Sequence, residues 1–201
     1  MDEIVRQAIA KWPSVPHCYG WLALDARGTF RMRDEAAQIA NSPGDIIRHA
    51  ALLAFIHRNY THDERGAWFF QNGPQRVYVE LETTPFVART DPVHQFVLHD
   101  GEVMSAIDEA CLTDQGQLVL NNGRQIAMLD DRDLSQCLPL LKLQGQRIDD
   151  DRLLQWLASP NNDLGLSTRQ GDIPVRWVRS DRLASSFGFV KKPTPGGDSA
   201  P

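Results

Sequence analysis

Lysine and cysteine are both scarce in this chain of 201 residues. Only four of its 21 basic residues are lysines, and its three cysteines, Cys18, Cys111 and Cys137, are widely spaced. An odd number of distant cysteines, without a Cys-x-x-Cys pair, argues against both a disulfide framework and a structural zinc site. We therefore expect reduced thiols in a cytoplasmic protein.

Long apolar runs are also missing. The longest, Ala50–Ile56, is far too short to span a bilayer, and the acidic N-terminus lacks the apolar core of a signal peptide. Counting up to Asp91 gives 10 basic and 11 acidic residues, against 11 and 15 beyond it. Because neither part has a basic excess, the sequence predicts neither a nucleic-acid partner nor a membrane partner.

Several motifs that carry chemistry are absent. The chain has no Gly-rich phosphate loop, no Gly-x-Ser-x-Gly elbow and no His-Glu-x-x-His helix. We accordingly predict no cofactor and no set of catalytic residues. The leading hypothesis is a non-catalytic binding or regulatory module with an unidentified protein or small-molecule partner.

The strongest positive signal is a hairpin within residues 63–89. Here Asn72-Gly73 marks a turn between two apolar strands, because both residues tolerate positive φ. In the second strand, Val77 alternates with Arg76 and Tyr78, so these two share the opposite face. Residues 114–130 partly repeat the pattern, either by duplication of a hairpin unit or because similar turns recruit similar residues.

A helix is predicted to lie across this sheet. Ser42 has the chemistry of an N-cap, Pro43 suits the first helical position, and Asp45 suits the first turn. The apolar residues that follow, up to Ile56, recur at helical spacing and predict a broad buried face. We expect this helix to end near Tyr60.

Together these signals predict an α+β fold of two small lobes that meet at Asp91-Pro92. The first lobe, residues 1–91, is an antiparallel hairpin-rich sheet packed on one long helix. The second, residues 92–190, is a β-meander or partly open barrel with short helices. Residues 191–201, rich in proline and glycine, are predicted to form a disordered tail.

Trp68, Arg76 and Tyr78 are the best candidates for a binding surface. The run Trp68–Phe70 makes both faces of its strand apolar, so one face needs a second layer, a partner or a second copy of the chain. A homo-oligomer is one way to meet that need. An arginine and a tyrosine on one face suit an anion or an acidic partner, although a solvated face has the same pattern.

A different class of function is suggested by His57, His62 and Asp63. Two histidines and a carboxylate near the end of the predicted helix are the ligand types of a metal site. The alternative hypothesis is therefore a small metal-dependent or hydrolytic enzyme. Histidines at the end of a helix are also favourable there without any metal.

Two stretches carry a resemblance to known families. Residues 18–28, Cys-Tyr-Gly-Trp-Leu-Ala-Leu-Asp-Ala-Arg-Gly, together with 68–82 resemble a proteobacterial family of uncharacterised proteins, over most of residues 1–190. The motif Leu-Glu-Thr-Thr-Pro-Phe-Val at 81–87 resembles a second uncharacterised bacterial family. The resemblance implies a two-part, hairpin-rich α+β fold and carries over no activity and no catalytic residue.

Overall fold

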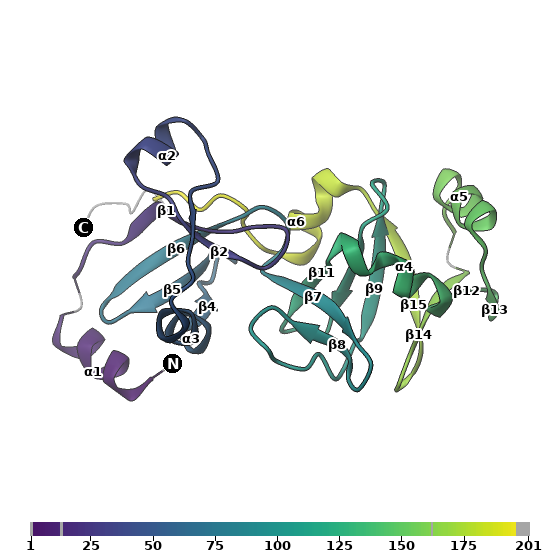
Figure 1. Cartoon of the computed structure of the whole chain (residues 1–201), viewed down its shortest axis with the longest axis horizontal. Helices are drawn as coiled ribbons and strands as arrows, with labels where there is room; N and C mark the ends of the chain where they lie inside the picture. The colour runs from purple at the N-terminus through teal and green to yellow at the C-terminus, as the bar shows by residue number, and fades with distance from the viewer. Residues whose placement is uncertain (1, 13, 162, 196–201) are drawn as a thin grey trace. The chain divides into compact units, whose positions relative to one another are not determined.

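The computed structural model describes residues 2–12, 14–161 and 163–195, which form two compact units (Figure 1). The first unit contains the described residues up to Thr83 and those from Gly188 onward, and the second spans Thr84–Phe187. The sequence indicates a boundary at Asp91 instead. The difference arises because residues 86–91 form a strand that pairs only with strands of the second unit.

The first unit is built on a six-stranded sheet in the order β3-β2-β1-β6-β5-β4. Its strands are β1 (Cys18–Leu24), β2 (Phe30–Met32), β3 (Asp45–Ile46), β4 (Tyr60–His62), β5 (Trp68–Asn72) and β6 (Gln75–Leu81). The predicted hairpin is confirmed, since Phe69 pairs with Tyr78 and Asn72 with Gln75. The sheet is mixed rather than antiparallel throughout, because β1 runs parallel to β6.

Three helices are described in this unit: α1 (Glu3–Lys11), α2 (Glu35–Ile39) and α3 (Ala50–Arg58). The prediction that a helix begins at Ser42 is wrong. Gly44 has a φ of +80°, which no α-helix accepts, and the chain then pairs with β2 as the short strand β3. The helix begins after His49, whose Nδ1 accepts a hydrogen bond from the Leu52 N–H at 3.2 Å.

The helix α3 covers one face of the sheet, as expected. The ring centroid of Phe55 lies 5.5 Å from that of Phe70 on β5, and Ile56 is only 1% exposed. The opposite face of β5 carries Phe69, which packs with Tyr78 and Val190. Both apolar faces of the Trp68–Phe70 run are therefore covered within the unit.

The second unit holds a nine-stranded sheet in the order β13-β12-β14-β15-β9-β10-β11-β7-β8. Its strands are β7 (Phe86–Asp91), β8 (Gln95–Leu98), β9 (Glu109–Thr113), β10 (Leu118–Asn121), β11 (Ile126–Leu129), β12 (Leu141–Leu143), β13 (Gln146–Arg147), β14 (Leu164–Thr168) and β15 (Gly171–Val178). The predicted meander is present as β9, β10 and β11, which pair antiparallel in sequence order.

This sheet curls into a half-barrel, which confirms the prediction of a partly open barrel. Because the sheet is curled, the edge strand β8 lies close to β14. The Gln95 side chain on β8 donates a hydrogen bond to the Ser167 carbonyl on β14 at 2.9 Å. The short helices of the unit are η1 (Asp131–Asp133), α4 (Leu134–Cys137), η2 (Leu138–Leu140), α5 (Asp150–Ala158), η3 (Ser180–Arg182) and α6 (Leu183–Phe187). No helix in the described chain is both long enough and apolar enough to cross a membrane.

The chain returns to the first unit after α6. Val190 forms a parallel bridge with Ala67, and the Leu81 N–H donates to the Lys191 carbonyl at 2.7 Å. The predicted tail thus begins with residues that are tied to β6. Residues 196–201 of that tail lie outside the described residues.

Candidate functional site

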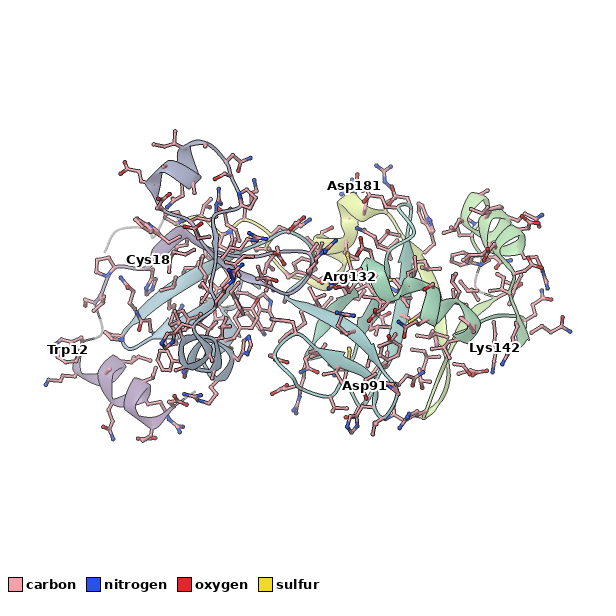
Figure 2. The ribbon with its side chains drawn as sticks, viewed as in Figure 1. Trp12, Cys18, Asp91, Arg132, Lys142 and Asp181 are labelled. Carbon is pink, nitrogen blue, oxygen red and sulfur yellow. The ribbon has the colours of Figure 1, made fainter. Side chains whose placement is uncertain are left out.

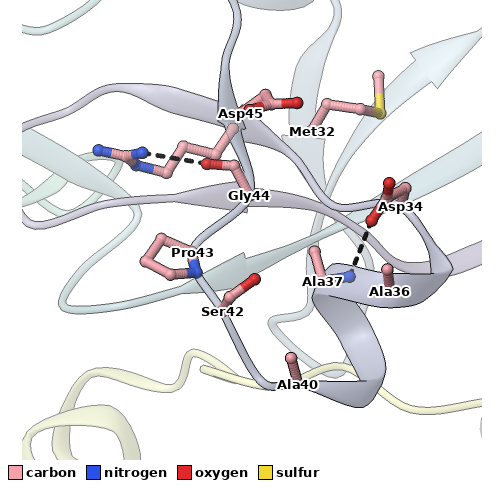
Figure 3. Close-up of a pocket in the computed structure, with 10 residues that line it drawn as sticks. Met32, Asp34, Ala36, Ala37, Ala40, Ser42, Pro43, Gly44 and Asp45 are labelled. Atoms are coloured by element: carbon pink, nitrogen blue, oxygen red, sulfur yellow. Dashed lines mark hydrogen bonds between the residues drawn. The ribbon is translucent and has the colours of Figure 1, made fainter.

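A pocket of about 540 Å³ opens beside β2 in the first unit, and we call it the strap pocket (Figure 3). It is lined by Arg31, Met32, Asp34, Ala36, Ala37, Ala40, Ser42, Pro43, Gly44 and Asp45. All ten belong to one excursion of the chain, which leaves the sheet at β2, forms α2 and returns as β3. The pocket is therefore a product of local sequence.

One wall of the pocket is α2. The Asp34 side chain caps this helix, since its Oδ1 accepts a hydrogen bond from the Ala37 N–H at 2.8 Å. The Gln38 amide reaches back to donate to the Arg33 carbonyl at 3.1 Å. These bonds hold Ala36 and Ala37 of α2, and Ala40 just after it, at the pocket, where their small side chains leave its volume open.

The opposite wall is the segment Asn41–Gly44, which we call the strap. It begins and ends with left-handed residues, Asn41 at φ +48° and Gly44 at φ +80°. A Cβ on Gly44 would lie 2.2 Å from the Met32 carbonyl oxygen, so only glycine allows the strap to approach β2 this closely. The strap then continues directly into the edge strand β3.

Two arginines hold the strap by its carbonyl groups. Arg31 donates to the Gly44 carbonyl at 3.2 Å and pairs with Asp25 at 2.8 Å. Arg33, which is buried, donates to the Ser42 carbonyl at 3.1 Å and forms an ion pair with Glu80. Both guanidinium groups thus have carboxylate partners outside the strap pocket, so their charge is largely neutralised.

A second hollow of about 240 Å³ lies on the other side of the strap. It shares Arg31, Ser42 and Pro43 with the strap pocket and adds Glu80 and Lys192 to its lining. Because three residues line both spaces, a ligand that shifts the strap would alter both. The returning C-terminal segment reaches this second hollow through Lys192.

The electrostatic character of the strap pocket comes from Asp34 and Asp45. In Figure 3 these carboxylates flank Met32, with the alanine side chains of α2 below them. Asp45 and the Ser42 hydroxyl form no side-chain hydrogen bond with any residue that the structure describes. The pocket can therefore accept hydrogen bonds from a donor or cation and pack a small apolar body against alanine and methionine.

The structure separates the three residues predicted to form a binding surface. Trp68 is 6% exposed and lies on the α3 side of the sheet, with its ring centroid 4.8 Å from that of Tyr60. Tyr78 is 2% exposed and lies on the other face, stacked on Tyr19 at a centroid separation of 4.5 Å. Both aromatic rings are thus part of the core.

Arg76 shares the face of Tyr78, as the alternation predicts. Its guanidinium carbon lies 4.7 Å from the centroid of the Phe69 ring, a cation–π geometry, and the residue is half-buried. Of the three candidates, Arg76 is therefore the one that presents a charged group at the surface. A partner-binding role for Trp68, Arg76 and Tyr78 stays a prediction.

The other candidate set, His57, His62 and Asp63, is not gathered into a ligand cluster. The His57 ring lies 5.7 Å from Phe30, whereas His62 Nδ1 contacts the Asp63 carbonyl oxygen at 2.9 Å. In the described part of the chain, no group of three or more His, Cys, Asp or Glu side chains could hold a metal ion.

The Asp63 carboxylate is already engaged. It accepts hydrogen bonds from Arg65 at 3.1 Å, from the Tyr78 hydroxyl at 3.1 Å and from the Ala67 N–H at 3.0 Å. Burial by itself would raise the pKa of Asp63, but these hydrogen bonds outweigh it and hold the pKa below its ordinary value. Asp63 is therefore a structural anion that organises the start of β5.

Sequence reasoning missed the strap pocket, although local signals for it exist. Asp34 before Glu-Ala-Ala-Gln is an N-cap followed by helix formers, and this predicts α2. Gly44, inside the apparent cap motif that starts at Ser42, signals a turn. The pairing of Arg31 and Arg33 with Asp25 and Glu80 has no local signal, because it depends on strand register.

Family comparison agrees with the resemblance that the sequence suggests. The chain belongs to the family described as "Protein of unknown function (DUF2946)", whose model, DUF2944, matches residues 1–194. That description assigns no activity. A search of the curated proteins found no match.

Two solved structures are similar to this chain. One is "a DUF1285 family protein" from Silicibacter pomeroyi DSS-3, with 13% identity, a TM-score of 0.49, and coverage of 88% of this chain and 96% of that chain. The other is a DUF1285 family protein from Shewanella baltica OS155, with 16% identity, a TM-score of 0.40, and coverage of 56% and 85%. Neither description names a ligand or a reaction.

Proposed function

We propose that this protein is a non-catalytic binding module whose strap pocket takes a small ligand with an ammonium or other cationic group. The observation that carries the proposal is the pairing of two carboxylates, Asp34 and Asp45, with an alanine wall in one pocket. Arg31 lines the same pocket, but its charge is matched by Asp25, so the pocket keeps an excess of negative charge.

The chemistry of the lining supports binding rather than catalysis. The residues around the strap pocket include no histidine, cysteine or lysine, and among the described residues no hydrogen bond joins the Ser42 hydroxyl to a carboxylate. A nucleophile needs an adjacent base or a lowered pKa, and a general acid needs a pKa near neutrality. Carboxylates next to small apolar side chains instead suit recognition by charge and shape.

The test uses n-butylammonium as a probe, followed by two-dimensional NMR of the full chain. We expect it to shift the amide signals of residues 34–45 with a Kd in the millimolar range, because one ion pair and a short chain supply little energy. The neutral n-butanol should bind more weakly, by up to about fivefold, since an ion pair with an exposed carboxylate contributes at most about 1 kcal/mol.

Matched variants separate the pocket from the general surface charge. Asp45→Asn should weaken butylammonium binding about fivefold, since it removes a carboxylate that makes no structural hydrogen bond. Glu64→Gln, an exposed site away from the pocket, serves as the control and should bind as the original protein does. Equal binding of butanol and butylammonium would contradict the proposal.

A second binding proposal concerns Trp68, Arg76 and Tyr78. Its support is the half-buried guanidinium of Arg76 on a rigid strand, where it could pair with an acidic partner. Titration with a hexaglutamate peptide tests it: Arg76→Gln should abolish binding, whereas the exposed Arg27→Gln should not. Binding that survives Arg76→Gln would place the acidic partner elsewhere.

Elemental analysis distinguishes a binding module from the enzyme alternative. A small metal-dependent or hydrolytic enzyme using His57, His62 and Asp63 would carry stoichiometric zinc, manganese or iron, and would lose it on His57→Ala. The chain of 201 residues, purified without chelators, is the sample to measure. Metal content well below one per chain would remove the metal-dependent form of this alternative.

We also propose a bacterial cytoplasm as the compartment and a homo-oligomer as the assembly. The three cysteines are unpaired, which supports a reducing environment. Trp12, which Figure 2 shows at the end of α1, is 51% exposed, and Trp21 is 45% exposed, so apolar surface is available for self-association. Multi-angle light scattering measures the molar mass in solution. A monomer mass across micromolar concentrations would reject the homo-oligomer.

A further inference from the structure

A further cavity, of about 190 Å³, lies in the second unit at the place where the half-barrel closes. Its lining joins residues at the start of β8 and in the loop before β9 with the turn between β14 and β15. The mouth of a curled sheet is a common place for ligands, because side chains from several strands converge there.

The closure is held by the side chain of Gln95, a residue whose backbone has an unusual conformation. Gln95 has a φ of +72°, a left-handed geometry that is unfavourable for a non-glycine residue. Its amide spans the gap, donating to the Ser167 carbonyl and accepting from the Arg169 N–H, both at 2.9 Å. Gln95 therefore fixes where the backbone of Arg169 lies at the cavity.

Arg169 is fixed at its other end as well. One of its guanidinium N–H groups donates to the Pro92 carbonyl at 2.9 Å, and no carboxylate of the described chain pairs with it. This is unlike Arg31, Arg89 and Arg176, which are all in ion pairs. Arg169 is thus a positioned cation whose charge remains available.

The rest of the lining matches this charge. His94, Ser105 and Gln170 add polar groups at the rim, while the side chains of Met104 and Ile107, 2% and 7% exposed, form an apolar floor. The lining contains no carboxylate, although the whole chain has a net charge of −5. Hydrogen-bond donors and a cation above an apolar floor suit an anion with an apolar tail.

We propose that this cavity binds a small organic anion: a carboxylate with a short alkyl chain, held by Arg169 and packed on Met104 and Ile107. A cavity of 190 Å³ has room for about six water volumes, which is close to the size of a five-carbon acid. The residues involved belong to the second unit, so this site is independent of the strap pocket.

Sodium pentanoate is the probe, titrated into the full chain at constant ionic strength and followed by two-dimensional NMR. The expected result is a saturable shift of the amide signals around Ser105 and Gln170 with a millimolar Kd. Pentanamide, which has the same shape without the charge, should bind at least about tenfold more weakly. Inorganic phosphate should also bind more weakly, because it cannot use the apolar floor.

Two variants, each with a matched control, test whether the positive charge of Arg169 at this cavity is needed to bind pentanoate. Arg169→Gln should weaken pentanoate binding at least about tenfold, whereas Arg124→Gln, an exposed arginine in the turn between β10 and β11, should not. Val103→Glu places a carboxylate at the rim of the cavity and should also weaken binding. Leu154→Glu, at a residue on α5 that is 64% exposed and does not line the cavity, is its control.

The rim variant keeps the test decisive even where Arg169→Gln disturbs the closure, because Val103 is 40% exposed and tolerates a polar side chain. Equal binding of pentanoate and pentanamide would overturn the proposal. So would equal affinities of the Val103→Glu and Leu154→Glu variants for pentanoate. Phosphate binding tighter than pentanoate binding would show an inorganic anion site and would reject the alkyl carboxylate.

Discussion

Cys111 and Cys137 illustrate how burial controls the chemistry of a single residue. Both side chains have no exposed surface, and removal from water raises the pKa of each thiol to about 12. The thiolate is the reactive form, so these residues are inert at neutral pH. Cys18 on β1 is only half-buried, so its thiol is more accessible than the other two.

We predict that an aromatic disulfide reagent will modify at most one thiol in the native protein. Cys18 should react within minutes, whereas Cys111 and Cys137 should react only after unfolding in urea. The measurement is thiol release followed by absorbance, with Cys18→Ser as the control that abolishes the fast phase. Two fast thiols in the native protein would show that the core opens readily.

Asp130 and Asp133 are the buried carboxylates of the second unit, at 1% and 2% exposure. Hydrogen bonds from Arg132 lower the pKa of Asp130, and those from Arg89 lower the pKa of Asp133. A lowered pKa in the folded state means that the charged form stabilises folding above the unfolded pKa of about 4. That contribution is lost as the pH falls below about 4.

Asp133→Asn should therefore reduce stability at pH 7 by about 1.5–3 kcal/mol, the usual worth of a hydrogen bond to a charged group. It should also make stability decline less steeply between pH 5 and pH 3. Asparagine does not titrate, so unfolding of the variant no longer takes up the proton that the Asp133 carboxylate would bind. Urea unfolding at a series of pH values measures both effects. An unchanged pH dependence would mean that Asp133 has an ordinary pKa.

At the scale of the element, the strap depends on its glycine. Gly44→Ala should cost about 2–4 kcal/mol, since it combines a left-handed conformation with a backbone clash. Gly116→Ala is the matched control: Gly116 has a φ of +72° with open space around its Cβ position, so it should cost only about 1–2 kcal/mol. Thermal unfolding of both variants measures the two losses of stability. Equal losses would show that the strap moves away from β2 to make room for the added Cβ.

The hairpins were predictable element by element, whereas the start of α3 was not. A hairpin turn is decided by a few adjacent residues, so Asn72-Gly73 was a sufficient signal for β5 and β6. Ser42 and Pro43 gave an equally plausible helix start. Gly44 overrode it, because its φ of +80° is incompatible with a helix and the hydrogen bonds from Arg31 and Arg33 to the Gly44 and Ser42 carbonyls hold the strap against β2.

At the scale of the whole molecule, the first unit is completed by the end of the chain. Gly66 lies so close to the returning segment that a Cβ would be 1.9 Å from the Gly188 carbonyl oxygen. The Val190 N–H donates to the Gly66 carbonyl at 3.0 Å, and Phe189 is only 5% exposed. These contacts insert the segment between the start of β5 and the end of β6.

Truncation after Phe187 should consequently destabilise the first unit by about 3–5 kcal/mol, comparable to the loss of one large buried side chain. Hydrogen exchange measures the effect unit by unit. Amides of β5 and β6 should lose protection, while those of β9 and β10 serve as the internal control and should keep theirs. Equal loss in both units would indicate a single cooperative structure.

The sequence alone determined the local features of this protein: the α+β class, the β5–β6 and β10–β11 hairpins, and the absence of familiar catalytic motifs. These follow from residue spacing and turn chemistry within a few positions. The tertiary structure decided the parallel pairing of β1 with β6, the return of residues 188–193 and the strap and half-barrel cavities. Each of these joins residues that no local pattern links, because register and burial are properties of the assembled sheets.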